Sequence, residues 1–356
     1  MVPYIISKRE NFLEDYSLHK KYKYDFSVSG KTLIQYPFSP HFCNILNKLD
    51  CYIDRNEECK LLDFLASKYH INKDNLILGP GANGILQNII KILFNKPGLN
   101  IVTPFYTFHQ ACYGVFSMSC DVRYVKMGKD FSINFHNMQK SVDENTKMVF
   151  LCNPNNPTGL IVKPEEIIDF AKSVNTFVVV SEASIEFSRS KSLLSYKLPN
   201  NLIVIRSFSK DFGLAGIRLG FAYMSSKFKN HYLERTPTNQ VGNVSILIAN
   251  YACKNYKTIN KNIARVSREV EYFQKQLRTL NVPYLKSCSN SIMICKGVNK
   301  KILQILEEQE FKVVVITGEK GELFVRIAVQ KRKINKKFIK LIKQLKEKYN
   351  ENFFSN

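Results

Sequence analysis

The feature that most constrains the fold of this chain is a series of short apolar runs, rich in β-branched residues, that alternate with segments of helical periodicity. The helical patterns include residues 85–94 and 164–173. The apolar runs fall at residues 75–78, 100–102, 148–152, 177–180 and 202–206. Runs of this length are typical of strands that are buried on both faces. Their alternation with helices predicts a mostly parallel sheet covered on both sides, a three-layer α/β arrangement.

The C-terminal third has a different pattern. A long amphipathic helix is predicted for residues 261–280, strands for residues 291–295 and 323–329, and a basic amphipathic helix for residues 331–348. This order is typical of a smaller α+β domain packed beside the first.

Length supports the same division, because 356 residues exceed what a single hydrophobic core usually spans. We place an N-terminal arm at residues 1–40, a large domain at 41–240 and a small domain at 241–356. The arm is irregular and aromatic, and we expect it to pack on the small domain or on a partner subunit.

The net charge of +22 first suggests an acidic partner such as nucleic acid or a membrane surface. The lysines are spread along the chain, however, and the densest group lies on the amphipathic pattern of residues 331–348. We therefore expect solvated basic faces and neither of these partners. A positive field also suits an anionic small molecule.

The nine cysteines form no C-x-x-C pair, their number is odd and several lie in apolar runs. These features favour free thiols in a reducing compartment and no metal site. The N-terminus does not resemble a signal peptide, and no apolar run approaches the length that spans a membrane. We expect a cytoplasmic protein.

The first segment that carries chemistry is SFSKDFGLAGIRLG at residues 207–220, directly after an apolar run. Ligands of open α/β sheets bind at the carboxyl ends of the strands, where Lys210 would lie. A lysine amine forms a Schiff base with an aldehyde cofactor. Ser207, Ser209 and Arg218 could hold a phosphate. On its own, the segment also fits a surface loop with an ordinary lysine.

The second segment is NPNNPTG at residues 153–159, directly after the apolar run that ends at Cys152. Two prolines and a glycine predict a rigid turn. Such a turn at the end of a strand can direct an asparagine amide into a cleft, although it also fits a plain turn.

In this order and separation, the two segments resemble the class I and II aminotransferases, and more narrowly the histidinol-phosphate aminotransferases, over about residues 25–326. The resemblance implies the fold type I architecture of pyridoxal-phosphate-dependent enzymes: a three-layer large domain with a mostly parallel sheet, plus a smaller α+β domain. It implies pyridoxal 5′-phosphate as the cofactor and a small, anionic amino compound as the substrate. It also implies a homodimer, because the active sites of the family form at the subunit interface.

The resemblance implies a role for each matching residue. Lys210 forms the covalent link to the cofactor and moves the substrate proton, and Arg326 binds the substrate carboxylate. Asn156 bonds the phenolic oxygen of the cofactor, Tyr106 stacks on its ring, and Tyr52 reaches the cofactor phosphate of the partner subunit. The phosphate contacts in the same subunit are Gly81, Ala82, Asn83, Ser207, Ser209 and Arg218.

The chain departs from the family pattern at the ring. Ser181 stands where the family has the aspartate that bonds the pyridine nitrogen, and a hydroxyl cannot keep that nitrogen protonated well. Glu182 is a poor substitute, because neighbouring strand residues face opposite sides. Ser184 replaces the family's aromatic residue beside the phenolic oxygen. A milder departure is Ile53, where the subgroup has a proline.

Three functions remain open at this stage. The first is an aminotransferase that acts on an amino acid or amino-alcohol phosphate. The second is a decarboxylase, or an elimination or replacement enzyme, that acts on an O-phospho amino acid; the Ser181 departure favours it, as does a similarity of residues 25–27 to threonine-phosphate decarboxylases. The third is a degenerate protein that binds the cofactor or a partner without turnover.

Overall fold

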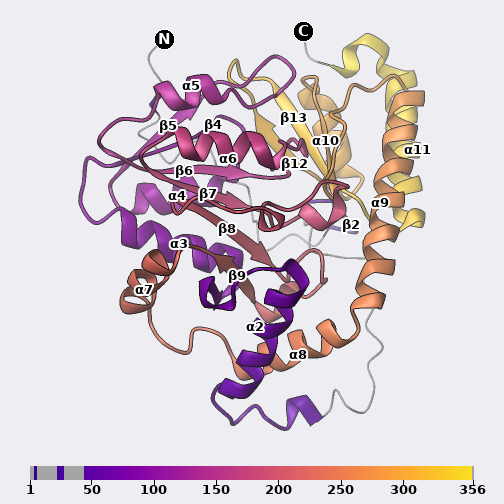
Figure 1. Cartoon of the computed structure of the whole chain (residues 1–356). Coiled ribbons are helices and arrows are strands. Elements are labelled where there is room, and N and C mark those ends of the chain that lie inside the picture. Colours follow the sequence, from indigo (N-terminus) through magenta and orange to yellow (C-terminus); the bar gives the residue numbers. More distant parts are fainter. Residues whose placement is uncertain (1–3, 6–21, 28–43, 355–356) are drawn as a thin grey trace.

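The computed structural model describes residues 4–5, 22–27 and 44–354. Its centre is an eight-stranded sheet in the order β1-β5-β4-β6-β7-β8-β9-β3 (Figure 1). In that order, the strands are β1 (Tyr4–Ile5), β5 (Asp121–Val125), β4 (Asn100–Pro104), β6 (Thr146–Cys152), β7 (Phe177–Ser181), β8 (Leu202–Ser207), β9 (Gly220–Tyr223) and β3 (Leu76–Gly79). The strands from β5 to β8 are parallel to one another, whereas β1 and β9 run antiparallel to their neighbours.

The five strands predicted from apolar runs are all present, and the mostly parallel α/β sheet is confirmed. Three strands of the same sheet were not predicted, among them the two-residue β1. β5 carries Arg123 at its centre, and β9 begins with a glycine and has four residues, so neither gives a long apolar run. Both are specified by the neighbours with which they pair rather than by their own pattern.

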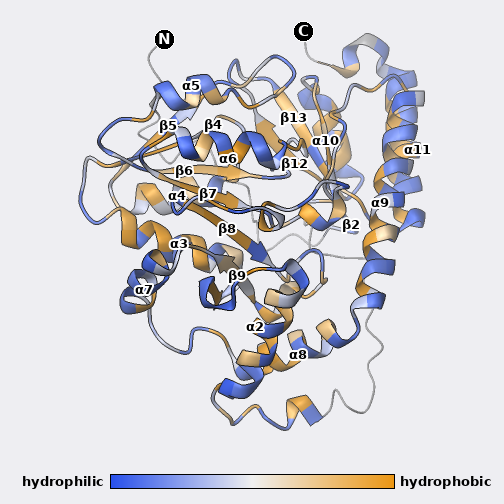
Figure 2. Ribbon diagram, viewed as in Figure 1, coloured by the Kyte–Doolittle hydropathy of each residue, from blue (hydrophilic) through white to orange (hydrophobic). Residues whose placement is uncertain are grey.

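Helices cover both faces of the sheet (Figure 1). Alternate residues of the central strands enter two separate hydrophobic cores: Met148 and Phe150 belong to one, and Val149 and Leu151 to the other. Figure 2 shows these strands as largely hydrophobic, as expected for a sheet buried on both sides. The first core is closed by α3 (Gly81–Leu93), α4 (His109–Ser117) and α7 (Ser226–Arg235), and the second by α2 (Arg55–Tyr69), α5 (Phe135–Lys140), α6 (Pro164–Ser173) and α8 (Asn243–Lys254).

The C-terminal third forms a second, antiparallel sheet. Its three strands are in the order β10 (Ser291–Ile294), β13 (Leu323–Ala328) and β12 (Val314–Thr317). A third core lies between this sheet and α9 (Tyr256–Thr279), α10 (Lys300–Glu308) and α11 (Arg332–Tyr349). The short β2 (Tyr24–Asp25) joins this region by parallel pairing with β11 (Phe311–Lys312).

The basic helix predicted at the C-terminus is α11, which is largely hydrophilic in Figure 2 and buries Phe338 and Ile342. None of the helices in the described parts of the chain is long and apolar enough to cross a membrane. The boundaries at residues 40 and 240 stay predictions. Most of the arm at residues 1–40, apart from 4–5 and 22–27, lies outside the described residues.

Candidate active site

The site lies in a cavity of about 230 Å³ at the carboxyl ends of the parallel strands. Cys152, Ser181 and Ser207 are the last residues of β6, β7 and β8, and all three line it. Ten of the thirteen predicted site residues also line it: Ala82, Asn83, Asn156, Ser181, Ser184, Ser207, Ser209, Lys210, Arg218 and Arg326.

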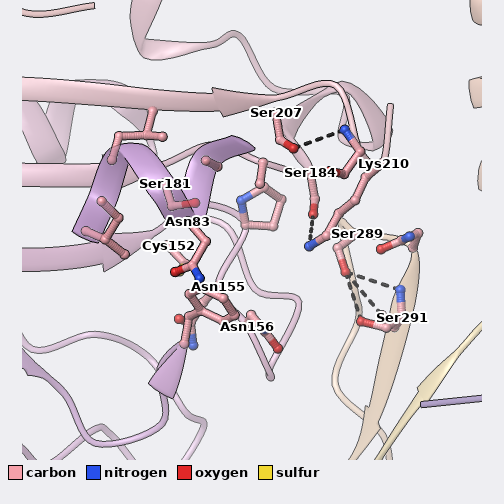
Figure 3. Close-up of a pocket in the computed structure, with 18 of the residues that line it drawn as sticks. Asn83, Cys152, Asn155, Asn156, Ser181, Ser184, Ser207, Lys210, Ser289 and Ser291 are labelled. Atoms are coloured by element: carbon pink, nitrogen blue, oxygen red, sulfur yellow. Dashed lines mark hydrogen bonds between the residues drawn. The ribbon is translucent and has the colours of Figure 1, made fainter. Parts of the chain in front are cut away.

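Lys210 lines this cavity. Its Nζ donates a hydrogen bond of 3.1 Å to Oγ of Ser184 (Figure 3). Burial lowers the pKa of Lys210, and the Arg326 guanidinium lowers it further, while Cys152 and Asp211 act in the opposite direction. A lowered pKa increases the fraction of neutral amine, which is the form that attacks an aldehyde.

One end of the cavity is built to hold an anion. α3 begins there without a side-chain cap, so the amides of its first turn remain for a ligand. The Arg218 guanidinium lies directly against this helix start, because a Cβ added to Gly81 would lie 3.1 Å from Nη2 of Arg218. The hydroxyls of Ser207 and Ser209 line the same cavity. Helix amides, a guanidinium and hydroxyls together suit a phosphate, so this end fits the phosphate of the expected cofactor.

The turn at residues 153–159 has the rigidity that its prolines predict. Asn153 bonds Val162 through both its Oδ1 and its Nδ2, at 2.9 and 3.0 Å. Asn155 donates to the carbonyl of Tyr106 at 2.9 Å. With these two amides engaged in the turn, Asn156 lines the cavity, and its Oδ1 accepts a bond of 2.8 Å from Arg326.

Arg326 comes from β13 of the second sheet and lines the part of the cavity wall that this sheet forms. Its side chain is buried, its Nη1 is held by Asn156, and its Nη2 donates to the carbonyl of Ser27 at 2.9 Å. Two fixed nitrogens orient the planar guanidinium toward the cavity. The expectation that strand alternation directs Arg326 into a cleft agrees with this position.

The charge of the cavity is positive. Among the described residues that line it, Lys210, Arg218 and Arg326 are cationic, and none is an aspartate or a glutamate. Glu182 faces away from the cavity, as expected from alternation. It accepts a 2.8 Å bond from the backbone of Leu193. Ser181 is therefore the polar residue that β7 contributes.

Beneath Lys210 lies a buried ionic cluster centred on Arg206. Its Nη2 pairs with Glu186 at 2.7 Å and with Asp211 at 3.7 Å, and its Nη1 with Glu182 at 3.5 Å. Burial raises the pKa of Asp211 well above its usual value, and Arg206 opposes this effect. Burial likewise raises the pKa of Glu182. Arg206 is the cation that these carboxylates share, and Glu186 also pairs with Lys68 at 3.6 Å.

Three predicted site residues lie outside the cavity lining. Gly81 lies behind Ala82, against Arg218. Tyr52 is on the surface with 88% of its area exposed. Tyr106 packs among aromatic rings, with Phe131 and Phe324 at 5.2 and 5.9 Å between centroids, and burial raises its pKa to about 12.

Stacking of Tyr106 on the cofactor ring stays a prediction, and a second aromatic residue lies nearby. Phe108, two positions after Tyr106, lines the cavity. The segment between β4 and α4 is irregular, so a spacing inferred from sequence could not settle which ring turns inward.

Sequence reasoning also missed Ser27, Cys152 and the wall formed by residues 289–291. The last of these left a visible signal, since the polar run SCSNS at residues 287–291 leads into an otherwise apolar strand.

Comparisons with known proteins agree with this geometry. A family profile described as "Aminotransferase class I and II" matches residues 47–342. The histidinol-phosphate aminotransferase of Christiangramia forsetii is 31% identical over 314 residues, which cover 84% of this chain and 86% of that protein. The enzyme of the same name from Caldicellulosiruptor saccharolyticus is 29% identical over 320 residues, 84% of this chain and 85% of that protein.

Solved structures share the fold. The histidinol-phosphate aminotransferase from Sinorhizobium meliloti, in complex with pyridoxal-5′-phosphate, has a TM-score of 0.81 at 17% identity and covers 92% of each chain. The L-threonine-O-3-phosphate decarboxylase from Porphyromonas gingivalis has a TM-score of 0.73 at 19% identity, over 91% of this chain and 99% of that one. The chain belongs to the class I and II aminotransferases, a family of pyridoxal-phosphate-dependent enzymes.

Proposed function

We propose that this enzyme transfers the amino group of a phosphorylated amine, such as histidinol phosphate, to a keto acid. The observation that carries the proposal is that Lys210 lines one cavity together with two arginines, Arg218 and Arg326. One guanidinium serves the cofactor phosphate and the other an anionic substrate. The names of the relatives support the phosphorylated amine.

When bound, the cofactor supplies an aldehyde that condenses with amines and a ring that withdraws electrons from the bonds at the substrate α-carbon. The start of α3, Arg218, Ser207 and Ser209 would hold its phosphate. Asn156, whose amide oxygen is held by Arg326, keeps its N–H groups for the phenolic oxygen.

Lys210 acts as the general base. Its amine is bonded to Ser184, and the lowered pKa keeps a neutral fraction available as a general base. As the general base, Nζ would remove the proton from the substrate α-carbon. Arg326 fixes the substrate anion, so that this proton stays within reach of Nζ.

The proposal includes a homodimer in the cytoplasm. Leu46, Leu49 and Tyr52 expose 45%, 72% and 88% of their areas on one segment before α2. Three large side chains exposed together suit an interface with a second copy, and Tyr52 then reaches the partner's cofactor phosphate. Sedimentation velocity tests this directly, and a protein that stays monomeric at micromolar concentration would contradict it.

A decarboxylase or elimination activity on an O-phospho amino acid is the second candidate. The specific observation that favours it is Ser181 in a cavity where none of the described lining residues carries a carboxylate, because a ring nitrogen without an acidic partner withdraws electrons less strongly. The third candidate, a degenerate binding protein, conflicts with the retention of Lys210, Asn156, Arg218 and Arg326 in one place.

The test begins with an absorbance spectrum of the protein loaded with the cofactor. The unaltered protein should show a visible band, and Lys210→Ala should abolish it. Reduction of the unaltered protein with borohydride should attach the cofactor to Lys210. Histidinol phosphate with 2-oxoglutarate should yield glutamate and a carbonyl product. Release of carbon dioxide or inorganic phosphate without keto-acid consumption would select the second candidate, and a band that responds to no amine would select the third.

A further inference from the structure

A wall of small polar side chains faces Lys210 across the cavity. Ser289, Asn290 and Ser291 line it, and each is at least 93% buried. The segment that carries them is fixed to the turn at residues 153–159, because the amide of Cys288 donates a 2.8 Å bond to the carbonyl of Gly159. The wall is thus positioned by the same turn that presents Asn156.

Strand register brings this wall next to Arg326. In the antiparallel pair of β10 and β13, Ser291 is opposite Ala328 and Met293 is opposite Arg326. Residues two apart share a face, so the side chains of Ser291 and Arg326 lie on the same side of the sheet. The opposite side carries Ile292 and Val325, which belong to the third core.

The hydroxyls of this wall are weakly engaged. Oγ of Ser289 accepts a 3.2 Å bond from the amide of Ser291. It lies 3.3 Å from Oγ of Ser291, and 3.4 Å from both the carbonyl of Ser291 and Oγ of Ser287 (Figure 3). Hydroxyl hydrogen bonds are usually about 2.7–2.8 Å long. These long contacts can be exchanged at little cost for shorter bonds to an anion, which are roughly twice as strong as neutral ones.

We propose that Ser289 and Ser291, together with Arg326, form an oxyanion subsite that selects a tetrahedral phosphate ester on the substrate over a planar carboxylate. A guanidinium fork satisfies two oxygens, which completes a carboxylate but leaves one terminal oxygen of a phosphate. The rotating hydroxyls donate to that remaining oxygen. No described lining residue carries a negative charge that would repel it. This inference rests on the proposed function and identifies the group of the substrate that the site recognises.

The test compares Ser289→Ala/Ser291→Ala with the unaltered holoenzyme. The control is Cys288→Ala, which alters the same segment at a side chain that does not line the cavity. We expect KM for histidinol phosphate to rise at least tenfold in the double variant, because two hydrogen bonds to a charged group are lost. Both kcat and KM for 2-oxoglutarate should change less than about threefold. Retained affinity for the carboxylate shows that the variant is folded.

Calorimetric titration of the holoenzyme with inorganic phosphate separates this inference from the proposed function, because it needs no turnover. The bound cofactor occupies the Arg218 end, so phosphate reports on the Arg326 end. Weaker phosphate binding in the double variant alone supports the subsite, even if histidinol phosphate is not a substrate. Unchanged phosphate binding, or an equal loss for phosphate and 2-oxoglutarate, would overturn it. A loss of the same size in Cys288→Ala would overturn it as well.

Discussion

Gly220 is a position where one added methyl group should disturb both the sheet and the start of α3. It begins β9 opposite Ser207, and a Cβ there would lie 2.6 Å from the amide nitrogen of Ala82 and 2.8 Å from the carbonyl oxygen of Arg206. Both neighbours are backbone atoms, so no side-chain rotation relieves the contact. Either α3 or the β8–β9 pair must move.

The expected cost of Gly220→Ala is about 1–3 kcal/mol of unfolding free energy, the range for an overpacked core. The start of α3 also holds the cofactor phosphate in our proposal. A shift of about 1 Å in such a binding element can weaken function by roughly a hundredfold, so cofactor affinity should fall together with stability. Urea unfolding of the apoprotein measures the first effect, and an absorbance titration with cofactor measures the second.

Gly216→Ala is the matched control. It lies four residues earlier in the same segment, and no atom lies within 4 Å of its added Cβ. A glycine-to-alanine change at such a site is expected to stabilise by about 0.4–1 kcal/mol through the unfolded chain. The reasoning fails if Gly220→Ala unfolds within about 0.5 kcal/mol of the unaltered protein and binds the cofactor equally well.

Three further predictions concern charge. Arg206→Met should lower the free energy of unfolding in urea by about 3–5 kcal/mol, because it leaves buried carboxylates without this guanidinium. Arg189→Met removes only an exposed ion pair with Glu271 and should change that free energy by less than about 1 kcal/mol. Equal losses in the two variants would contradict this account of the cluster. Burial lowers the folded pKa of Lys210 below 10.5, so the folded apoprotein binds fewer protons there and its stability rises with pH up to that value. Lys210→Met should therefore be more stable than the unaltered apoprotein at neutral pH, with the difference shrinking toward pH 10.5, and parallel pH profiles would count against a buried cationic amine. Ser181→Asp should shift the absorbance of the bound cofactor and favour keto product over any elimination product; an unchanged spectrum would mean that residue 181 does not contact the ring.

The sequence alone was sufficient where a local pattern has a single structural solution. β-branched apolar runs between helical segments predicted the central strands, because a strand buried on both faces must be apolar throughout. The N-P-N-N-P-T-G turn and the S-x-S-K segment each follow such a strand, so the position of Asn156 and Lys210 at one sheet edge followed from strand direction. Alternation similarly separated Ser181 from Glu182.

Tertiary structure decided what depends on which distant segments meet. Phe108 rather than Tyr106 lines the cavity, because the ring of Tyr106 packs against Phe131 and Phe324. Arg326 and Asn156, 170 positions apart, are joined by one hydrogen bond that no local pattern encodes.

The polar run that contains Ser289 and Ser291 is visible in the sequence, but its position on the cavity wall depends on how the two sheets pack. Side-chain direction along one strand is set by the pleat, and a sequence reveals it. Which side chain lies across the cavity depends on how whole layers pack, and this packing is determined by long-range contacts.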